Sequence, residues 1–208
     1  MKIYKDLVQW TEEWLELRAW VITWTKLKSV VWSVTVQKTI MYELIWEEFT
    51  PIEPGIKNKA MERWNELEPI AKKKYEELTW EKVEEVWFIK TEDYVWLSPD
   101  WIIKKDWKYS KAVEIKCPMW KNFSRYILEN KIPAEYKWQV VHYFVVMEDL
   151  EELDFIIFNP DFYIKEAQMK ILNIKRDDLF ADIEKAKISI KDFRVNWLKN
   201  INLLITKW

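Results

Sequence analysis

Residues Leu97–Met119, LSPDWIIKKDWKYSKAVEIKCPM, carry the most informative pattern of the chain. Asp100 lies at the end of one short extended run, and after a turn a second run alternates Glu114 and Lys116 with apolar residues. Because residues two apart on a strand point to the same face, Glu114 and Lys116 project together, and a β-hairpin would bring Asp100 beside them. Two carboxylates and one ammonium group at one point suit a hard divalent cation and an anionic transition state.

An Asp followed by Glu-x-Lys on a strand is the pattern of the PD-(D/E)xK nucleases. The spacing alone also fits a solvated hairpin with ordinary charges, because Glu-x-Lys is common on exposed strands. The identities of the residues are more specific than their spacing. Ser98-Pro99-Asp100 and the run EIKCP from Glu114 resemble the core of the YqaJ-type viral recombinases, relatives of phage lambda exonuclease. The resemblance implies an α/β (α+β) fold with a restriction-endonuclease-like core, in which a central mixed β-sheet is flanked by helices.

Length and composition predict one globular domain over residues 1–208, since half of the residues are hydrophobic and a third are charged. The family resemblance covers about 8–160 and leaves a carboxy-terminal strand and helix in 161–208. No apolar run has membrane-spanning length and the first ten residues lack a secretory pattern, so we expect a cytoplasmic protein with no membrane partner. Cys117, the single cysteine, excludes an intrachain disulfide and a Cys-based zinc site.

The glycine content is abnormal. The chain has 1 glycine and 16 tryptophans, whereas average usage would give roughly 15 glycines. Five tryptophans stand where glycine chemistry is wanted, in an Asp-x hairpin turn, at the end of a Ser-Pro-Asp turn, or after expected helix ends: Trp107, Trp101, Trp20, Trp32 and Trp80. Bulky aromatic residues tolerate a positive φ poorly.

We therefore interpret most of the tryptophans as UGA codons that the source organism reads as glycine; the alternative is a genuinely tryptophan-rich protein. The inferred glycine positions are Trp10, Trp20, Trp24, Trp32, Trp46, Trp64, Trp80, Trp87, Trp96, Trp101, Trp107 and Trp120. Trp14 lies in a helix on an apolar stripe and is expected to be a true tryptophan. Trp138, Trp197 and Trp208 are left open. Glycine codons or UGG at the twelve positions of the gene would end the idea.

The amino-terminal pattern predicts a helix over 11–19 and a second helix from Thr23 or Thr25 to Val31. With glycine at positions 10, 20 and 24, residues 9–25 read QGTEEWLELRAGVITGT and resemble the opening of the YqaJ family, whose helix arginine contacts DNA phosphate. That resemblance makes Arg18 a candidate clamp for the 5′-phosphate; the alternative is a helix-terminal cation favoured by the dipole. Ser98 is a further candidate for substrate binding.

A long helical pattern covers 57–79, and Pro69 predicts a kink or break near Asn65–Glu66. With glycine at positions 64 and 80, residues 62–80 read ERGNELEPIAKKKYEELTG and resemble the family helix that carries an essential acid. Glu68 matches that acid, with Glu66 as second choice. Without the resemblance, either residue would be taken as an ordinary solvated glutamate.

A helix is expected over Ala134–Met147, in which Tyr136 and Gln139 are three residues apart and share a face. The text IPAEYKWQVVHY resembles the family's Tyr-x-x-Gln motif, where the glutamine lies by the metal cluster. His142, the sole histidine, is expected to be a packed or surface residue rather than a base. Residues 34–56 have a mixed pattern. Strands are expected at 83–90, 93–97 and 153–158, and a run at Gln168–Lys175 is expected to pair nearby. The remaining expected helices are one at about 119–129 and a final one from Asp177 or Asp178 to about Leu204.

The resulting hypothesis is hydrolysis of phosphodiesters with Mg²⁺, or with Mn²⁺ in its place. Asp100, Glu114 and the Ile115 carbonyl would hold the ion, and Glu68 would complete or bridge the cluster. Such an ion lowers the pKa of a bound water. Lys116 would orient or deprotonate that water, or stabilise the pentacovalent oxygens.

Gln139 and Tyr136 would position water or phosphate. By resemblance, the chain is a 5′-to-3′ exonuclease of linear double-stranded DNA in phage-type recombination, and it leaves a 3′ strand for a single-strand annealing protein. Homotrimers are found among relatives. Residues 104–138 carry 9 basic and 4 acidic side chains, a distribution that suits contact with a phosphate backbone.

Two alternatives stay open. One is another nuclease of the RecB or CRISPR-associated kind, although the single cysteine argues against the iron–sulfur cluster that many of those carry. The other is a non-catalytic DNA-binding protein of the same fold, because a true indole at Trp101, beside Asp100, would block the metal site.

Overall fold

The computed structural model describes residues 2–5, 11–19, 21–50, 59–91, 95–105 and 107–207, the side chains of 59–61 excepted. In these ranges the helices are α1 (Glu12–Arg18), α2 (Trp24–Trp32), α3 (Val34–Phe49), α4 (Lys59–Thr79), α5 (Trp120–Glu129), α6 (Lys137–Val146) and α7 (Phe180–Thr206). The strands are β1 (Lys2–Tyr4), β2 (Phe88–Lys90), β3 (Trp96–Leu97), β4 (Trp101–Lys105), β5 (Lys108–Lys116), β6 (Glu152–Phe158) and β7 (Met169–Lys175).

The core of the fold is a mixed four-stranded sheet in the order β4-β5-β6-β7. Strands β4 and β5 form the predicted antiparallel hairpin, with Trp101 opposite Val113. Strand β6 runs parallel to β5 and antiparallel to β7, and the chain between β5 and β6 forms α5 and α6. A smaller antiparallel sheet has the order β1-β2-β3. The predicted mixed sheet flanked by helices is therefore confirmed.

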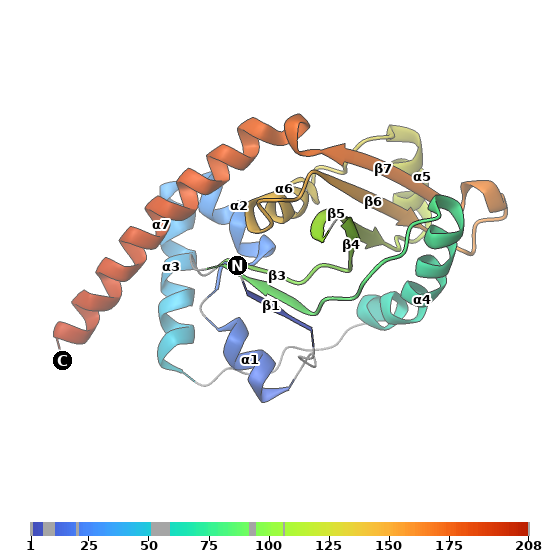
Figure 1. Cartoon of the computed structure of the whole chain (residues 1–208). Coiled ribbons are helices and arrows are strands. Elements are labelled where there is room, and N and C mark those ends of the chain that lie inside the picture. Colours follow the sequence, from blue (N-terminus) through green and yellow to red (C-terminus); the bar gives the residue numbers. More distant parts are fainter. Residues whose placement is uncertain are drawn as a thin grey trace.

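Helices cover both faces of the larger sheet (Figure 1). Val113 and Ile115 of β5 pack with Leu67 and Ala71 of α4 on one face. On the other face, sheet residues pack with the apolar side chains of α2, α3, α6 and α7. Because β5 alternates, Glu114 points away from α4 and toward α6. This alternation brings the Glu-x-Lys pair against a buried helix.

Helix α6 is buried on all sides: every residue from Gln139 to Val146 lies in the interior. The sequence predicted a longer helix, Ala134–Met147, but the helix begins at Lys137 and packs against α2, α7 and β3. A helix that is apolar all round packs in this way. As a result, the polar residues Gln139, His142 and Tyr143 are drawn into the core.

Several predicted boundaries are wrong. Helix α4 continues through Pro69 without the break expected near Asn65–Glu66, because the buried side chains of Leu67, Ala71 and Tyr75 hold both halves against the sheet. The mixed region 34–56 contains the helix α3. Strands β2 and β3 are shorter than expected, and α7 begins at Phe180, after a 3₁₀ turn over Arg176–Leu179.

Three tryptophans have left-handed backbone conformations. In the described ranges, the residues other than glycine with positive φ are Trp80 (61°), Trp107 (67°), Trp120 (49°) and Asn130 (48°). The expectation for Trp80 and Trp107 is confirmed. Trp32 ends α2 and Trp101 lies in β4, both without positive φ; Trp10 and Trp20 lie outside the described residues.

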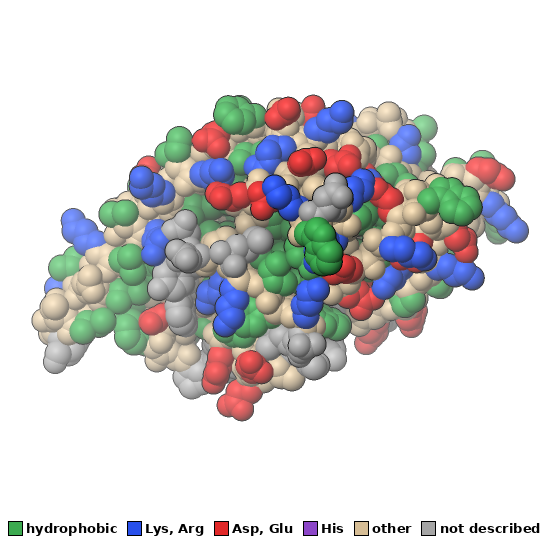
Figure 2. Space-filling view, in the orientation of Figure 1, with side chains coloured by type: hydrophobic (Ala, Val, Ile, Leu, Met, Phe, Trp, Pro, Cys, Tyr) green, Lys and Arg blue, Asp and Glu red, His purple; other side chains and the backbone are tan. Residues whose placement is uncertain are grey.

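The surface is mixed in charge. Figure 2 shows lysine, arginine and acidic side chains intermingled on the face drawn, without one broad basic area. None of the helices in the described ranges is both long and apolar enough to cross a membrane.

Candidate active site

Glu114 is the centre of a buried hydrogen-bonded cluster. Only 1% of the residue is exposed, and its carboxylate accepts hydrogen bonds from Gln139 Nε2 at 2.7 Å and from the hydroxyl of Tyr143. Lys116 Nζ lies 2.5 Å from the same carboxylate. Strand β5 and helix α6 thus meet at this residue. The Glu-x-Lys pair of β5 lies against the glutamine of the Tyr-x-x-Gln motif.

Asp100 lies beside this cluster, at the start of β4. Its Oδ2 accepts a hydrogen bond from the backbone N–H of Ile115 at 2.6 Å, while its own N–H donates to Tyr143 Oη at 3.2 Å. Burial, together with the charge of Glu114, raises the pKa of Asp100 well above its ordinary value. Two acids are therefore held close together with little water to screen them.

Lys116 is the cation of the site. Burial lowers its pKa, but the charges of Glu114 and Asp100 act in the opposite direction, and the pKa stands above its ordinary value. The ammonium group also lies 4.9 Å from the ring centroid of Tyr136. This lysine can donate hydrogen bonds and offset negative charge beside both carboxylates.

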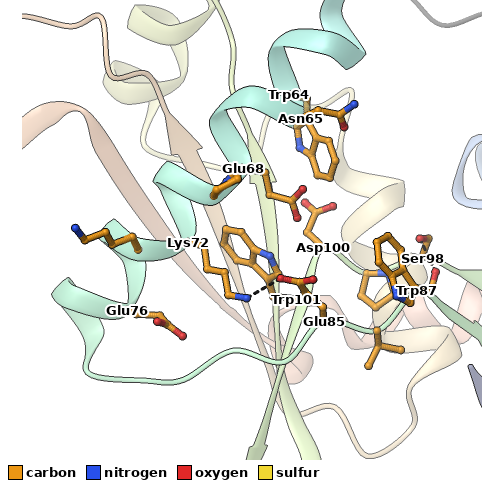
Figure 3. Close-up of a pocket in the computed structure, with 14 residues that line it drawn as sticks. Trp64, Asn65, Glu68, Lys72, Glu76, Glu85, Trp87, Ser98, Asp100 and Trp101 are labelled. Carbon is orange, nitrogen blue, oxygen red and sulfur yellow. Dashed lines mark hydrogen bonds and ion pairs between the residues drawn. The ribbon is translucent and has the colours of Figure 1, made fainter. Parts of the chain in front are cut away.

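Glu68 and Asp100 line one cleft of about 540 Å³. Figure 3 shows their carboxylates facing each other, with the indoles of Trp64 and Trp101 on either side. Burial, and then the charge of Glu85, raises the pKa of Glu68 to about 7, although Trp101 and Lys72 oppose the shift. The α4 acid chosen from the sequence thus points toward the hairpin acid.

The donor set fits a hard cation. Asp100, Glu114 and Glu68 offer only oxygen, and Gln139 Oε1 is buried without a hydrogen-bond partner among the described residues. In the described part of the chain, no three His, Cys, Asp or Glu side chains form a ready metal-binding group. Mg²⁺ commonly takes one or two carboxylates and fills its remaining positions with water and substrate phosphate, so two closely held acids are sufficient.

The substrate-binding candidates are more dispersed. Ser98 lines the cleft and donates a hydrogen bond to the carbonyl of Trp87 at 2.8 Å. Tyr136 lies beside Lys116. Arg18 stacks on Trp14 and Trp96, with its guanidinium carbon 4.9 and 5.3 Å from the ring centroids, and is not among the residues that line the cleft.

Two other residues considered from the sequence stand apart. Glu66 is exposed and is not among the cleft residues. His142 is fully buried and hydrogen-bonded to the carbonyl of Trp96, and burial lowers its pKa to about 4. It is a packed residue, as expected.

Sequence reasoning missed Tyr143 and a second polar cluster. Tyr143 lies four residues after Gln139, so the two share a helix face, and this spacing was the available signal. The second cluster is centred on Asp154, which accepts hydrogen bonds from Tyr75, Lys111 and Asn173. An aspartate inside the apolar run LDFIIF was its only sign in the sequence.

Comparison with known proteins agrees with this architecture. The family model of the YqaJ-like viral recombinase domain matches residues 13–150, which is more than half of the chain. Among curated proteins, none matches the sequence.

Solved structures agree as well. An alkaline exonuclease from Laribacter hongkongensis (LHK-Exo) has a TM-score of 0.80 and 28% identity over 95% of this chain and 97% of that chain. The same protein in complex with dAMP has a TM-score of 0.78 at 28% identity, with the same coverage. A phage related exonuclease from Haemophilus somnus 129PT shares the fold, with a TM-score of 0.61, 15% identity, and coverage of 87% of this chain and 96% of that chain. With its central mixed sheet and its Asp100–Glu114–Lys116 cluster, the chain belongs to the YqaJ-like viral recombinase domain family.

Proposed function

We propose that this protein is a metal-dependent deoxyribonuclease that degrades linear double-stranded DNA from its 5′ ends. The observation that carries the proposal is the cluster of Glu114 and Lys116 on β5, beside which Asp100 lies and lines a cleft together with Glu68. The likeness to the alkaline exonuclease over nearly the whole chain supports the same activity. A role in phage-type recombination, with a single-strand annealing protein as partner, and assembly as a homotrimer belong to the same proposal.

Asp100, Glu114 and the Ile115 carbonyl would hold Mg²⁺ or Mn²⁺, with Glu68 facing them from α4. The bound ion supplies an activated water and offsets charge on the scissile phosphate. The chain's own contribution is orientation: Gln139 and Tyr143 fix the two oxygens of Glu114. A carboxylate fixed in this way loses little conformational entropy on binding a cation.

The other residues act on the substrate. Lys116 donates hydrogen bonds, so it orients the attacking water or offsets the charge that develops on the phosphate oxygens. Tyr136, beside it, and Gln139 position water or phosphate. Ser98 at the cleft wall and Arg18 on α1 are the proposed contacts to the 5′-phosphate, and a guanidinium group suits that anion.

The test uses the protein as given and a form with the twelve tryptophans replaced by glycine, each with duplex DNA labelled at the 5′ or the 3′ end. We expect Mg²⁺-dependent loss of the 5′ label first, no loss in EDTA, and no cleavage by Lys116→Met. Lys199→Met, on the exposed side of α7, is the matched control and should cleave normally. If both forms fold and neither cleaves DNA, the nuclease proposal is wrong and the non-catalytic DNA-binding alternative remains. The indole of Trp101 in the cleft favours that alternative.

A further inference from the structure

Trp80, Trp107 and Trp120 have no packing that accounts for their backbone conformation. Their φ values lie between 49° and 67°, in the region where a Cβ clashes with the backbone. They are 91%, 90% and 84% exposed, so the indoles bury little surface that could offset the strain. Asn130, the remaining residue with positive φ in the described ranges, is of a type that tolerates this region.

Two of the three positions, those of Trp80 and Trp107, are also ones that glycine commonly occupies. Trp80 directly follows α4, Trp107 lies in the β4–β5 turn, and Trp120 begins α5. The residue after a helix and the turn of a hairpin commonly need a left-handed residue. Local geometry and the near absence of glycine from the chain therefore point to one cause.

We propose that Trp80, Trp107 and Trp120 occupy glycine positions, and that the cleft tryptophans Trp64, Trp87 and Trp101 do so too, so that the working protein has an open cleft at Asp100. If the source organism reads UGA as glycine, its protein would have glycine at all six of these positions. The cleft part rests on the proposed function, whereas the backbone part does not.

The cleft tryptophans surround the acids. Trp64 and Trp101 flank Glu68 and Asp100 (Figure 3), and Trp101 is fully buried between β4 and α4, with its ring centroid 6.4 Å from that of Tyr75. Trp87 is 38% exposed on the cleft wall. A large aromatic side chain covers about 150–250 Å² of surface, so three of them restrict the approach of a DNA strand to the carboxylates.

The backbone part is tested by thermal unfolding. The triple variant Trp80→Gly, Trp107→Gly, Trp120→Gly should raise Tm by roughly 5–10 °C, from relief of three left-handed residues in a chain of this size. Two control variants are measured beside it. Asn130→Gly should leave Tm nearly unchanged, and Trp14→Gly, at a buried position, should lower Tm. An unchanged or lowered Tm in the triple variant would overturn the assignment.

The cleft part is tested in the background of that triple variant, with Trp64→Gly, Trp87→Gly and Trp101→Gly added. Binding of a 5′-phosphorylated duplex, measured by fluorescence anisotropy in Ca²⁺, should tighten at least tenfold, and nucleotide release in Mg²⁺ should rise by a similar factor. Should the buried Trp101→Gly change prevent folding, the double variant Trp64→Gly, Trp87→Gly gives the same comparison at the partly exposed positions.

The outcomes separate the two proposals. Equal binding by the folded indole and glycine forms would contradict the open cleft. Tighter binding without any cleavage would support the open cleft and contradict the nuclease. The Tm comparison decides the backbone assignment whichever of these results is found.

Discussion

At the scale of single residues, Glu114 joins β5 to α6, because both of its carboxylate oxygens accept hydrogen bonds from α6 side chains, those of Gln139 and Tyr143. The two-residue period of a strand was enough to put Glu114 and Lys116 on one face, and hairpin geometry was enough to bring Asp100 near them. Tyr143 was missed because its importance depends on α6 being buried on every side, which a local pattern does not reveal. Glu68 was chosen from family resemblance, since a single glutamate on a helix has no local sequence pattern that indicates a functional role.

Tyr143 gives the first residue-scale prediction. Tyr143→Phe removes the hydroxyl that donates to Glu114 and accepts from the Asp100 N–H. Two buried polar groups lose a partner, so we expect a loss of about 1–3 kcal/mol in the free energy of unfolding and a slower cleavage rate. Urea unfolding and a cleavage assay measure both effects. Tyr163→Phe, at a fully exposed tyrosine, should change neither; if Tyr143→Phe behaves in the same way, the bridging role is wrong.

His142 predicts a dependence of stability on pH. Its pKa is about 4 in the folded chain because burial disfavours the imidazolium form, against an ordinary value of 6.5. Between these values the unfolded chain binds more protons, so stability falls as the pH is lowered from 6.5 toward 4, by on the order of 1 kcal/mol per pH unit. Urea unfolding at pH 7 and pH 5 should show this loss in the unsubstituted chain and a smaller loss in His142→Gln. Equal losses would contradict the assignment.

At the scale of elements, one buried polar cluster ties α4 to the sheet. Asp154 on β6 accepts from Tyr75 on α4 at 2.6 Å and pairs with Lys111 on β5 at 2.7 Å. Tyr75 and Glu68 lie on the same helix, so this cluster also fixes where Glu68 stands relative to Glu114. The break predicted at Asn65–Glu66 failed for a related reason: contacts with the sheet outweigh the one hydrogen bond that Pro69 removes.

Lys111 provides the prediction for this cluster. Lys111→Met leaves Asp154 with its charge but without its cation, at a position only 2% exposed. Loss of one partner of a buried pair destabilises by about 3–5 kcal/mol, which urea unfolding would detect. Lys73→Met, which removes an exposed pair with Glu77 at 3.9 Å, should cost less than about 1 kcal/mol. Similar costs for the two variants would show that the buried Lys111–Asp154 pair contributes no more to stability than a surface pair.

At the scale of the whole molecule, hydrophobic pattern and resemblance together predicted the architecture. The apolar run LDFIIF identified β6 as a strand buried on both faces, and β7 pairs with it as expected. The helix α3, the reduced length of β2 and β3, and the division into two sheets were not foreseen, because they depend on contacts between segments distant in sequence. The cleft is likewise a property of the assembled chain, since α4 contributes one side and residues 85–87 and 98–101 contribute the other.

An exonuclease needs a DNA end, so linear and covalently closed circular duplex DNA should behave differently with this protein. The twelve-glycine form in Mg²⁺ should release nucleotides from the linear duplex and leave the closed circle intact, and Glu114→Gln should slow release by at least about a hundredfold, in the range found when one essential electrostatic group is removed. Cleavage of the closed circle at the same rate, or full activity in Glu114→Gln, would contradict an exonuclease site centred on Asp100 and Glu114.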